Sequence, residues 1–191
     1  KAEGQSTPEF LEIQIRYFLC YFAANIPLMV QMPYIYYRYV DSGCTQNDIG
    51  QIKVLYNLSA AALSILVGPV LSFLGHHKLL MICLFISILA SILRGIGGKN
   101  LFLLTSVIIG FSSAHLRVTF DDWFLSEENK IPNFSSQTHF IFVENFSLLQ
   151  VIISFIAFEL SGFIHNWTGT AGIFYFSAIL QFFALFIAYF S

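Results

Sequence analysis

The chain has 191 residues, of which 57% are hydrophobic and only 10% are charged, with a net charge of −2 at pH 7. Soluble domains carry about 25% charged residues, so a soluble fold of this size would leave much of its apolar surface in water. The composition therefore predicts an integral, multi-pass membrane protein whose main partner is the lipid bilayer. The small net charge excludes a basic surface for nucleic acid.

Six stretches of the chain are apolar enough to cross a bilayer, which takes roughly 20 mostly apolar residues. They are residues 13–37, 49–74, 79–96, 101–124, 139–164 and 172–190. Residues 1–12 precede them as an amino-terminal segment. Helices 1–3 then occupy residues 13–96 and helices 4–6 residues 97–191, which predicts an all-α polytopic fold built as a 3+3 repeat. Lys and Arg are divided evenly between the two ends, so charge does not set the orientation.

The first predicted span combines two prolines with two side-chain amides. Pro27 and Pro33 each remove a backbone donor, and Asn25 and Gln31 lie beside them. Membrane helices tolerate such kinks where neighbouring groups or water satisfy the freed carbonyls. Two interpretations follow: the kinks open the wall of a cavity, or they are packing bends whose amides are satisfied locally. Gly68-Pro69 predicts a similar break near the end of the second span.

Charged residues at membrane depth are a second signal, because each costs about 2.5–3.5 kcal/mol on insertion scales. Arg117 and Glu144 are the strongest cases, and Arg94 lies nearer a helix end. Each either faces a cavity, pairs with another group in a structural role, or reaches the membrane surface as an interfacial anchor.

Motifs for catalysis and metal binding are missing from the sequence. It contains no nucleophile elbow, phosphate-binding loop, zinc-protease motif or dinucleotide fingerprint. The three cysteines lack metal-ligand spacing, and adjacent His76 and His77 cannot share a helix face. The pair Asp121-Asp122 is interpreted as part of a solvated loop mouth. We therefore predict neither an enzyme nor a metal or cofactor site.

Three segments carry a family resemblance. Residues 33–36 read Pro-Tyr-Ile-Tyr, residues 50–56 read Gly-Gln-Ile-Lys-Val-Leu-Tyr, and residues 120–123 read Phe-Asp-Asp-Trp. Together they resemble the molybdate-anion transporter family of the major facilitator superfamily, with P-Y-L-Y at the end of one span, G-Q-I-x-x-L-Y at the start of the next and F-E-[SA]-W at the end of the fourth. The similarity runs in register from about Pro8 to Phe190.

The chain also departs from the pattern that the resemblance implies. The superfamily's charged loop between spans two and three has Ser72 and Phe73 in place of its acid and first base, which puts ordinary gating in doubt. An expected acid late in span one is Met29, and an expected arginine early in span four is Ser106. The positive charge at the end of span three is kept as Arg94.

The resemblance implies the amino-terminal six-helix half of a major facilitator fold that moves an oxyanion by alternating access against a second half. The residues expected to bind the oxyanion are Asn25, Gln31, Tyr34, Asn57, Arg94 and Arg117. Glu144 is expected to serve proton coupling or ion pairing. The alternative is a transporter-derived structural subunit, which no longer transports and packs against other membrane subunits.

Overall fold

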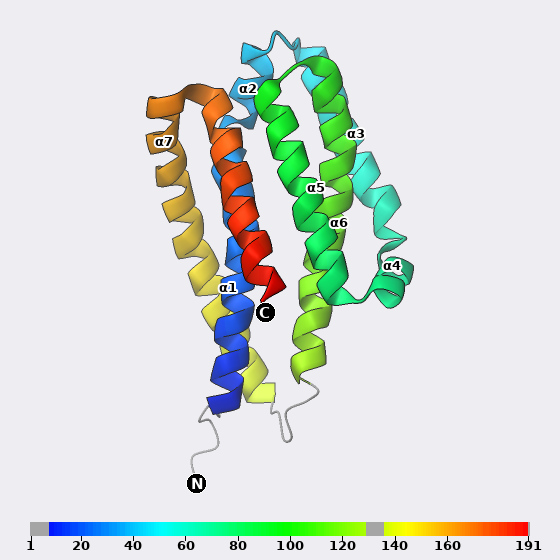
Figure 1. Cartoon of the computed structure of the whole chain (residues 1–191), viewed down its shortest axis with the longest axis vertical. Coiled ribbons are helices and arrows are strands. Elements are labelled where there is room, and N and C mark those ends of the chain that lie inside the picture. Colours follow the sequence, from blue (N-terminus) through cyan, green and yellow to red (C-terminus); the bar gives the residue numbers. More distant parts are fainter. Residues whose placement is uncertain (1–7, 129–135, 191) are drawn as a thin grey trace.

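The computed structural model describes residues 8–128 and 136–190, and every regular element in these ranges is helical. Residues 1–7 of the predicted amino-terminal segment and residues 129–135 of the polar stretch between the fourth and fifth spans lie outside this description. Figure 1 shows the helices side by side as a bundle, with most axes along its long direction.

The first pass contains α1 (Pro8–Gln31), a 3₁₀ turn η1 (Met32–Tyr34) and α2 (Ile35–Asp41). Together these elements form one continuous candidate membrane span from Phe10 to Asp41. Helix α1 runs on through Pro27, whereas Pro33 lies in the 3₁₀ turn. Only the second proline therefore coincides with a change of helix type, as expected where a backbone donor is missing.

The second pass is a broken helix. A reciprocal capping box between Thr45 and Asp48 starts α3 (Gln46–Ser64), which continues after a two-residue break as α4 (Val67–Leu74). The two helices are bent by 60° relative to each other. The break predicted near Gly68-Pro69 is confirmed, but it lies between Ser64 and Val67. Pro69 falls in the first turn of α4, where a proline is tolerated.

The remaining passes come from α5 (His76–Ile96), α6 (Lys99–Glu128) and α7 (Ser136–Tyr189). A straight helix of 54 residues would extend about 80 Å, far beyond the thickness of a bilayer. Helix α7 instead reverses at Gly169, whose φ of 70° is left-handed. Its first arm (residues 136–168) and second arm (residues 170–189) run antiparallel (Figure 1).

The described chain thus makes six helical passes. Four helices meet the length and composition of a spanning helix, and the bent pair of α3 and α4 forms a fifth span. The reversal of α7 divides the last of the four into two passes. The prediction of an all-α polytopic membrane protein is confirmed. Some bounds were too short, since α6 extends past the predicted residue 124 into a charged turn.

Contacts between the passes follow the predicted repeat. The first pass packs on both arms of α7, α6 packs on α3 and α5, and α5 packs on the second arm. If pass 1 is exchanged with pass 4, pass 2 with pass 5 and pass 3 with pass 6, the same set of contacts results. This pattern is what a 3+3 repeat predicts, while its boundary between residues 96 and 97 stays a prediction.

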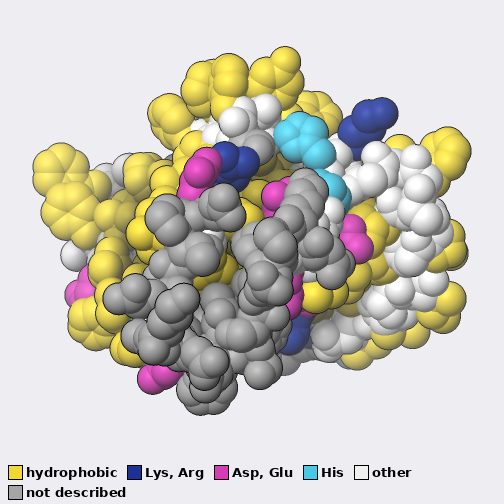
Figure 2. Space-filling view, turned by 90° about the horizontal axis from the view of Figure 1, so that it is seen from below, with side chains coloured by type: hydrophobic (Ala, Val, Ile, Leu, Met, Phe, Trp, Pro, Cys, Tyr) yellow, Lys and Arg dark blue, Asp and Glu magenta, His cyan; other side chains and the backbone are white. Residues whose placement is uncertain are grey.

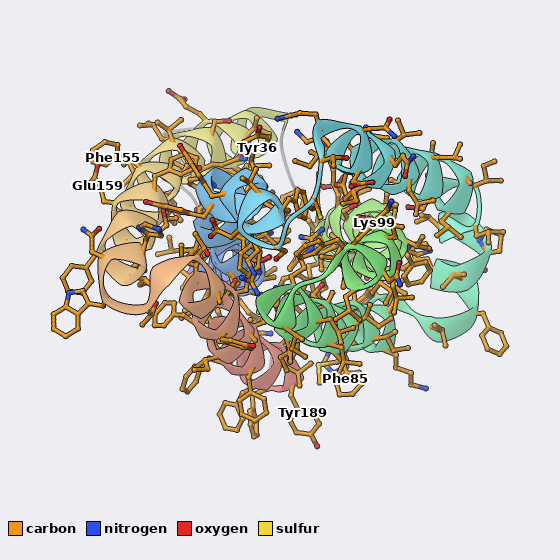
Figure 3. The ribbon with its side chains drawn as sticks, turned by 90° about the horizontal axis from the view of Figure 1, so that it is seen from above. Tyr36, Phe85, Lys99, Phe155, Glu159 and Tyr189 are labelled. Carbon is orange, nitrogen blue, oxygen red and sulfur yellow. The ribbon has the colours of Figure 1, made fainter. Side chains whose placement is uncertain are left out.

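The outer surface of the bundle is rich in large apolar side chains. Phe85 on α5 and Phe155 on α7 are 55% and 66% exposed and point away from the bundle (Figure 3). Seen from the end where α1 begins, hydrophobic side chains make up much of the rim of the bundle, with charged and histidine side chains among them (Figure 2). Such a surface suits lipid, because in water it would drive association.

Candidate functional site

A cavity of about 310 Å³ lies between α1, α6 and the first arm of α7. Its lining combines aromatic rings, amides, hydroxyls and one charge of each sign. The lining residues are Tyr17, Tyr21, Asn25, Leu28, Ser113, Leu116, Arg117, Phe120, Asp121, Phe146 and Gln150. We call this space the α1–α6–α7 cavity.

The side of the cavity formed by α1 consists of residues spaced four apart in the sequence. Tyr17, Tyr21 and Asn25 recur at i, i+4 and i+8, which places them on one helix face. The two tyrosine rings stack at 5.9 Å between centroids. Asn25 Nδ2 donates to the carbonyl oxygen of Tyr21 at 2.8 Å, which fixes the amide and leaves its side-chain oxygen without a donor among the described residues.

The wall from α6 has the same spacing and carries the charges. Ser113, Arg117 and Asp121 are each one turn apart on the face that lines the cavity. Arg117 interacts electrostatically with Asp121 and with Tyr21. Among the described residues, however, no carboxylate lies within the 4 Å of an ion pair with Arg117. Its guanidinium therefore retains donors for a ligand.

The first arm of α7 supplies Phe146 and Gln150, again one turn apart. The ring of Phe146 meets Tyr21 edge-on at 4.7 Å. Ser113 is also held by α3, because the Tyr56 hydroxyl donates to its Oγ at 3.3 Å. The cavity wall thus comes from three passes, and a fourth pass, α3, holds Ser113 in place.

Of the residues predicted to bind substrate, Asn25 and Arg117 share this cavity. Gln31 lies deeper, between α1, α5 and the second arm of α7. Its Nε2 donates to Ser91 Oγ at 2.8 Å and to Ser177 Oγ at 2.7 Å, and Ser91 donates to Gln181 Oε1 at 3.0 Å. Ser177 donates in turn to the carbonyl of Pro27. This network supports the packing interpretation for the Gln31 amide nitrogen, whereas its buried Oε1 has no partner among the described residues.

Three other predicted residues lie away from the cavity. Tyr34 stacks on the His165 ring at 4.5 Å between centroids, near the Gly169 turn. Asn57 on α3 and Glu144 on α7 are exposed on the outside of their helices. Their roles in binding and coupling stay predictions.

Arg94 is buried at the end of α5, with only 6% of its surface exposed. Its Nε has no hydrogen-bond partner among the described residues. Arg38 caps the same helix end, donating from Nε to the carbonyl of Arg94 at 3.1 Å and from Nη2 to that of Gly95 at 2.5 Å. Lys99 Nζ lies 2.6 Å from Asp48 Oδ1 and ties α6 to α3 at this end.

A second cavity, of about 410 Å³, lies at the end of the bundle opposite to Arg94 and Lys99. Its lining residues are Cys20, His76, His77, Leu80, Thr119, Phe120, Trp123, Glu127, Ala188, Tyr189 and Phe190. His76 Nδ1 is 3.8 Å from Asp122 Oδ2 beside it. Within residues 8–128 and 136–190, no group of three or more His, Cys, Asp or Glu residues could hold a metal ion.

One family model matches residues 1–190, and its description is sugar transporters with 12 transmembrane helices. The match spans nearly the whole chain. The chain belongs to this family of major facilitator-type membrane transporters. No curated protein matches the chain.

Membership fits the features of the chain described above. The described residues of this major facilitator-type chain make six helical passes, half of the number in the family description. The family consists of transporters rather than enzymes, in agreement with the sequence prediction. The apolar helices and the family match together make the protein an integral membrane transporter.

Proposed function

We propose that this chain forms one six-helix half of an oxyanion carrier, with the α1–α6–α7 cavity as part of its substrate site. The observation that carries the proposal is Arg117. It lines the cavity, and no described carboxylate lies within ion-pair distance of it. Guanidinium donors match the oxygens of tetrahedral anions better than an ammonium group does.

The other cavity groups supply what a tetrahedral dianion such as molybdate requires. Gln150 can donate from its side-chain amide, and so can the hydroxyls of Tyr17 and Tyr21. A volume of about 310 Å³ lies at the lower end of the usual range for small-molecule sites. Arg117 itself is exposed, so an anion could reach its guanidinium from outside the bundle.

Transport would follow from rocking of this bundle against a second one. In major facilitator proteins two six-helix halves enclose the substrate and expose it to each side in turn. A second half, or another membrane subunit, would then complete the site as the main protein partner. The polar ties at the Gly97 end, Arg38 to α5 and Lys99 to Asp48, make this bundle a stiff unit for such motion.

A neutral sugar is the second candidate substrate. Four aromatic rings and two amides line the cavity, and sugars use ring faces for their C–H surfaces and amides for their hydroxyls. The family description also names sugar transporters. Asp121 would then offset the charge of Arg117, leaving the cavity close to neutral.

Binding to the purified protein in lipid nanodiscs tests the proposal, with molybdate, sulfate and glucose as probes. We expect the oxyanions to bind, and Arg117→Ala to weaken them roughly tenfold to hundredfold, the value of hydrogen bonds to a charged group. Arg16→Ala is the matched control, because Arg16 is exposed and pairs with Glu12 on α1.

The other outcomes are equally informative. Glucose binding that survives Arg117→Ala would favour the sugar carrier. No binding of any probe would contradict transport by this cavity and favour the structural subunit. That alternative fits the position of Phe73, which replaces a gating charge and is 87% exposed.

A further inference from the structure

We infer that Asp121 is the proton-accepting residue of this cavity and that it makes the carrier a proton–oxyanion symporter. The inference rests on the proposed function. The sequence interpretation assigned Asp121 to a solvated loop mouth and placed coupling at Glu144. The structure puts Asp121 in the cavity wall with Arg117, and Glu144 on the outside of α7.

The position of Asp121 on α6 carries the argument. It lies one helical turn from Arg117 on the same lined face, near enough for electrostatic interaction but not within the 4 Å of an ion pair. The carboxylate therefore reduces the positive potential at the guanidinium without occupying its donors. An anion bound between the two would feel both charges.

The other groups facing Asp121 are few. From α1, Tyr17 and Tyr21 line the cavity, and Tyr17 interacts electrostatically with Asp121. From α7, Phe146 and Gln150 carry no titratable group. Arg117 is the other charged residue that α6 contributes to the lining, and Asp121 is the one carboxylate among the residues that line this cavity.

Proton binding and anion binding are coupled because the Asp121 carboxylate and the bound anion are both negative and both lie near Arg117. With Asp121 ionised, an incoming dianion is repelled by the carboxylate, and Arg117 is partly neutralised. A proton from water on Asp121 removes that repulsion, so anion and proton bind together. When the cavity opens to the other side and the anion leaves, the proton returns to water there. By linkage, each ligand raises the affinity for the other.

The test measures proton uptake when the anion binds. Protein in nanodiscs and weak buffer is mixed with dilute molybdate near neutral pH, and a pH indicator reports the protons taken up. We expect about one proton per bound anion for the wild type. Asp121→Asn should bind molybdate at least as tightly as the wild type but take up no proton. Asp121→Glu, which keeps the acid, should retain the uptake.

Asp122→Asn is the matched control, because Asp122 neighbours Asp121 but lies beside His76, outside the lining of this cavity. It should keep the wild-type proton uptake. Molybdate binding without proton uptake by the wild type, or unchanged uptake by Asp121→Asn, would overturn the inference and leave the proposed function standing. No molybdate binding by the wild type would overturn both.

Discussion

Gln31 on α1 donates a hydrogen bond of 2.8 Å to Ser91 on α5, across 60 residues of sequence. The same amide reaches Ser177 on the second arm of α7, and Ser91 continues to Gln181. All four side chains are buried. Interhelical hydrogen bonds of this kind hold membrane helices together where lipid provides no hydrophobic drive. Gln31 therefore holds three passes together.

Replacing Gln31 should weaken the bundle more than the binding site. Gln31→Ala removes two interhelical hydrogen bonds, each worth about 0.6 kcal/mol and at most about 1.7 kcal/mol in membrane proteins. We expect a loss of about 1–2 kcal/mol, measured by thermal unfolding in detergent. Gln51→Ala on the exposed face of α3 is the control. An unchanged melting temperature together with lost oxyanion binding would make Gln31 a substrate ligand instead.

The contact between α3 and α6 depends on Gly110. A Cβ atom at this position would lie 2.9 Å from the carbonyl oxygen of Tyr56 and 3.0 Å from the backbone nitrogen of Ala60. Backbone atoms cannot move aside without shifting the helix. Gly110→Ala should therefore destabilise the protein by about 1–3 kcal/mol, measured by chemical or thermal unfolding.

Gly50→Ala provides the comparison for Gly110. Gly50 also lies in a helix, α3, but nothing lies within 4 Å of a Cβ added there. Because alanine is the better helix former by about 1 kcal/mol, this variant should be as stable as the wild type or more so. Equal losses in the two variants would show that helix contact at Gly110 is not the cause.

Labelling of Cys44 can determine the orientation of the protein in the membrane, which the distribution of Lys and Arg does not set. Cys20 and Cys83 are buried, whereas Cys44 is partly exposed in the connection between α2 and α3. A membrane-impermeant maleimide should label one thiol per chain, and only from the side on which this connection lies. Cys44→Ser should abolish the labelling. Labelling that persists in this variant would mean that a buried cysteine becomes accessible.

The labelling rate should also depend on pH in a defined direction. Burial, reinforced by Asp48, raises the pKa of the Cys44 thiol, and Lys99 opposes this shift. Because the thiolate is the reactive form, the rate should reach half of its maximum at a higher pH than for a free thiol. Lys99→Ala should raise the pKa further and slow labelling. Faster labelling of this variant would contradict the assigned effect of Lys99.

The membrane passes were predictable because length and hydropathy determine them. The bounds of the helices were less predictable. Helix α6 continues to Glu128 through charged residues that hydropathy excludes, and no hydropathy value gives the 60° bend between α3 and α4.

The cavity was only partly predictable, since one sequence does not show which face of a helix is lined. Arg117 was identified from the cost of a charge in a membrane, and Asn25 from its place beside Pro27 in the first span. Asp121 was assigned to a loop because Asp122 and Glu127 follow it in the chain. A periodic signal was present in Ser113, Arg117 and Asp121 at four-residue spacing, repeated in Tyr17, Tyr21 and Asn25. The partners of Gln31, 60 and 146 residues away, come only from the fold.

Uptake of labelled molybdate into proteoliposomes tests the central claim most directly, namely that this protein moves an oxyanion through a cavity containing Arg117. The account predicts accumulation by the wild type, unchanged accumulation by Arg16→Ala, and a loss of roughly tenfold or more in Arg117→Ala. Equal uptake by the two variants, or none above empty liposomes for the wild type, would contradict it.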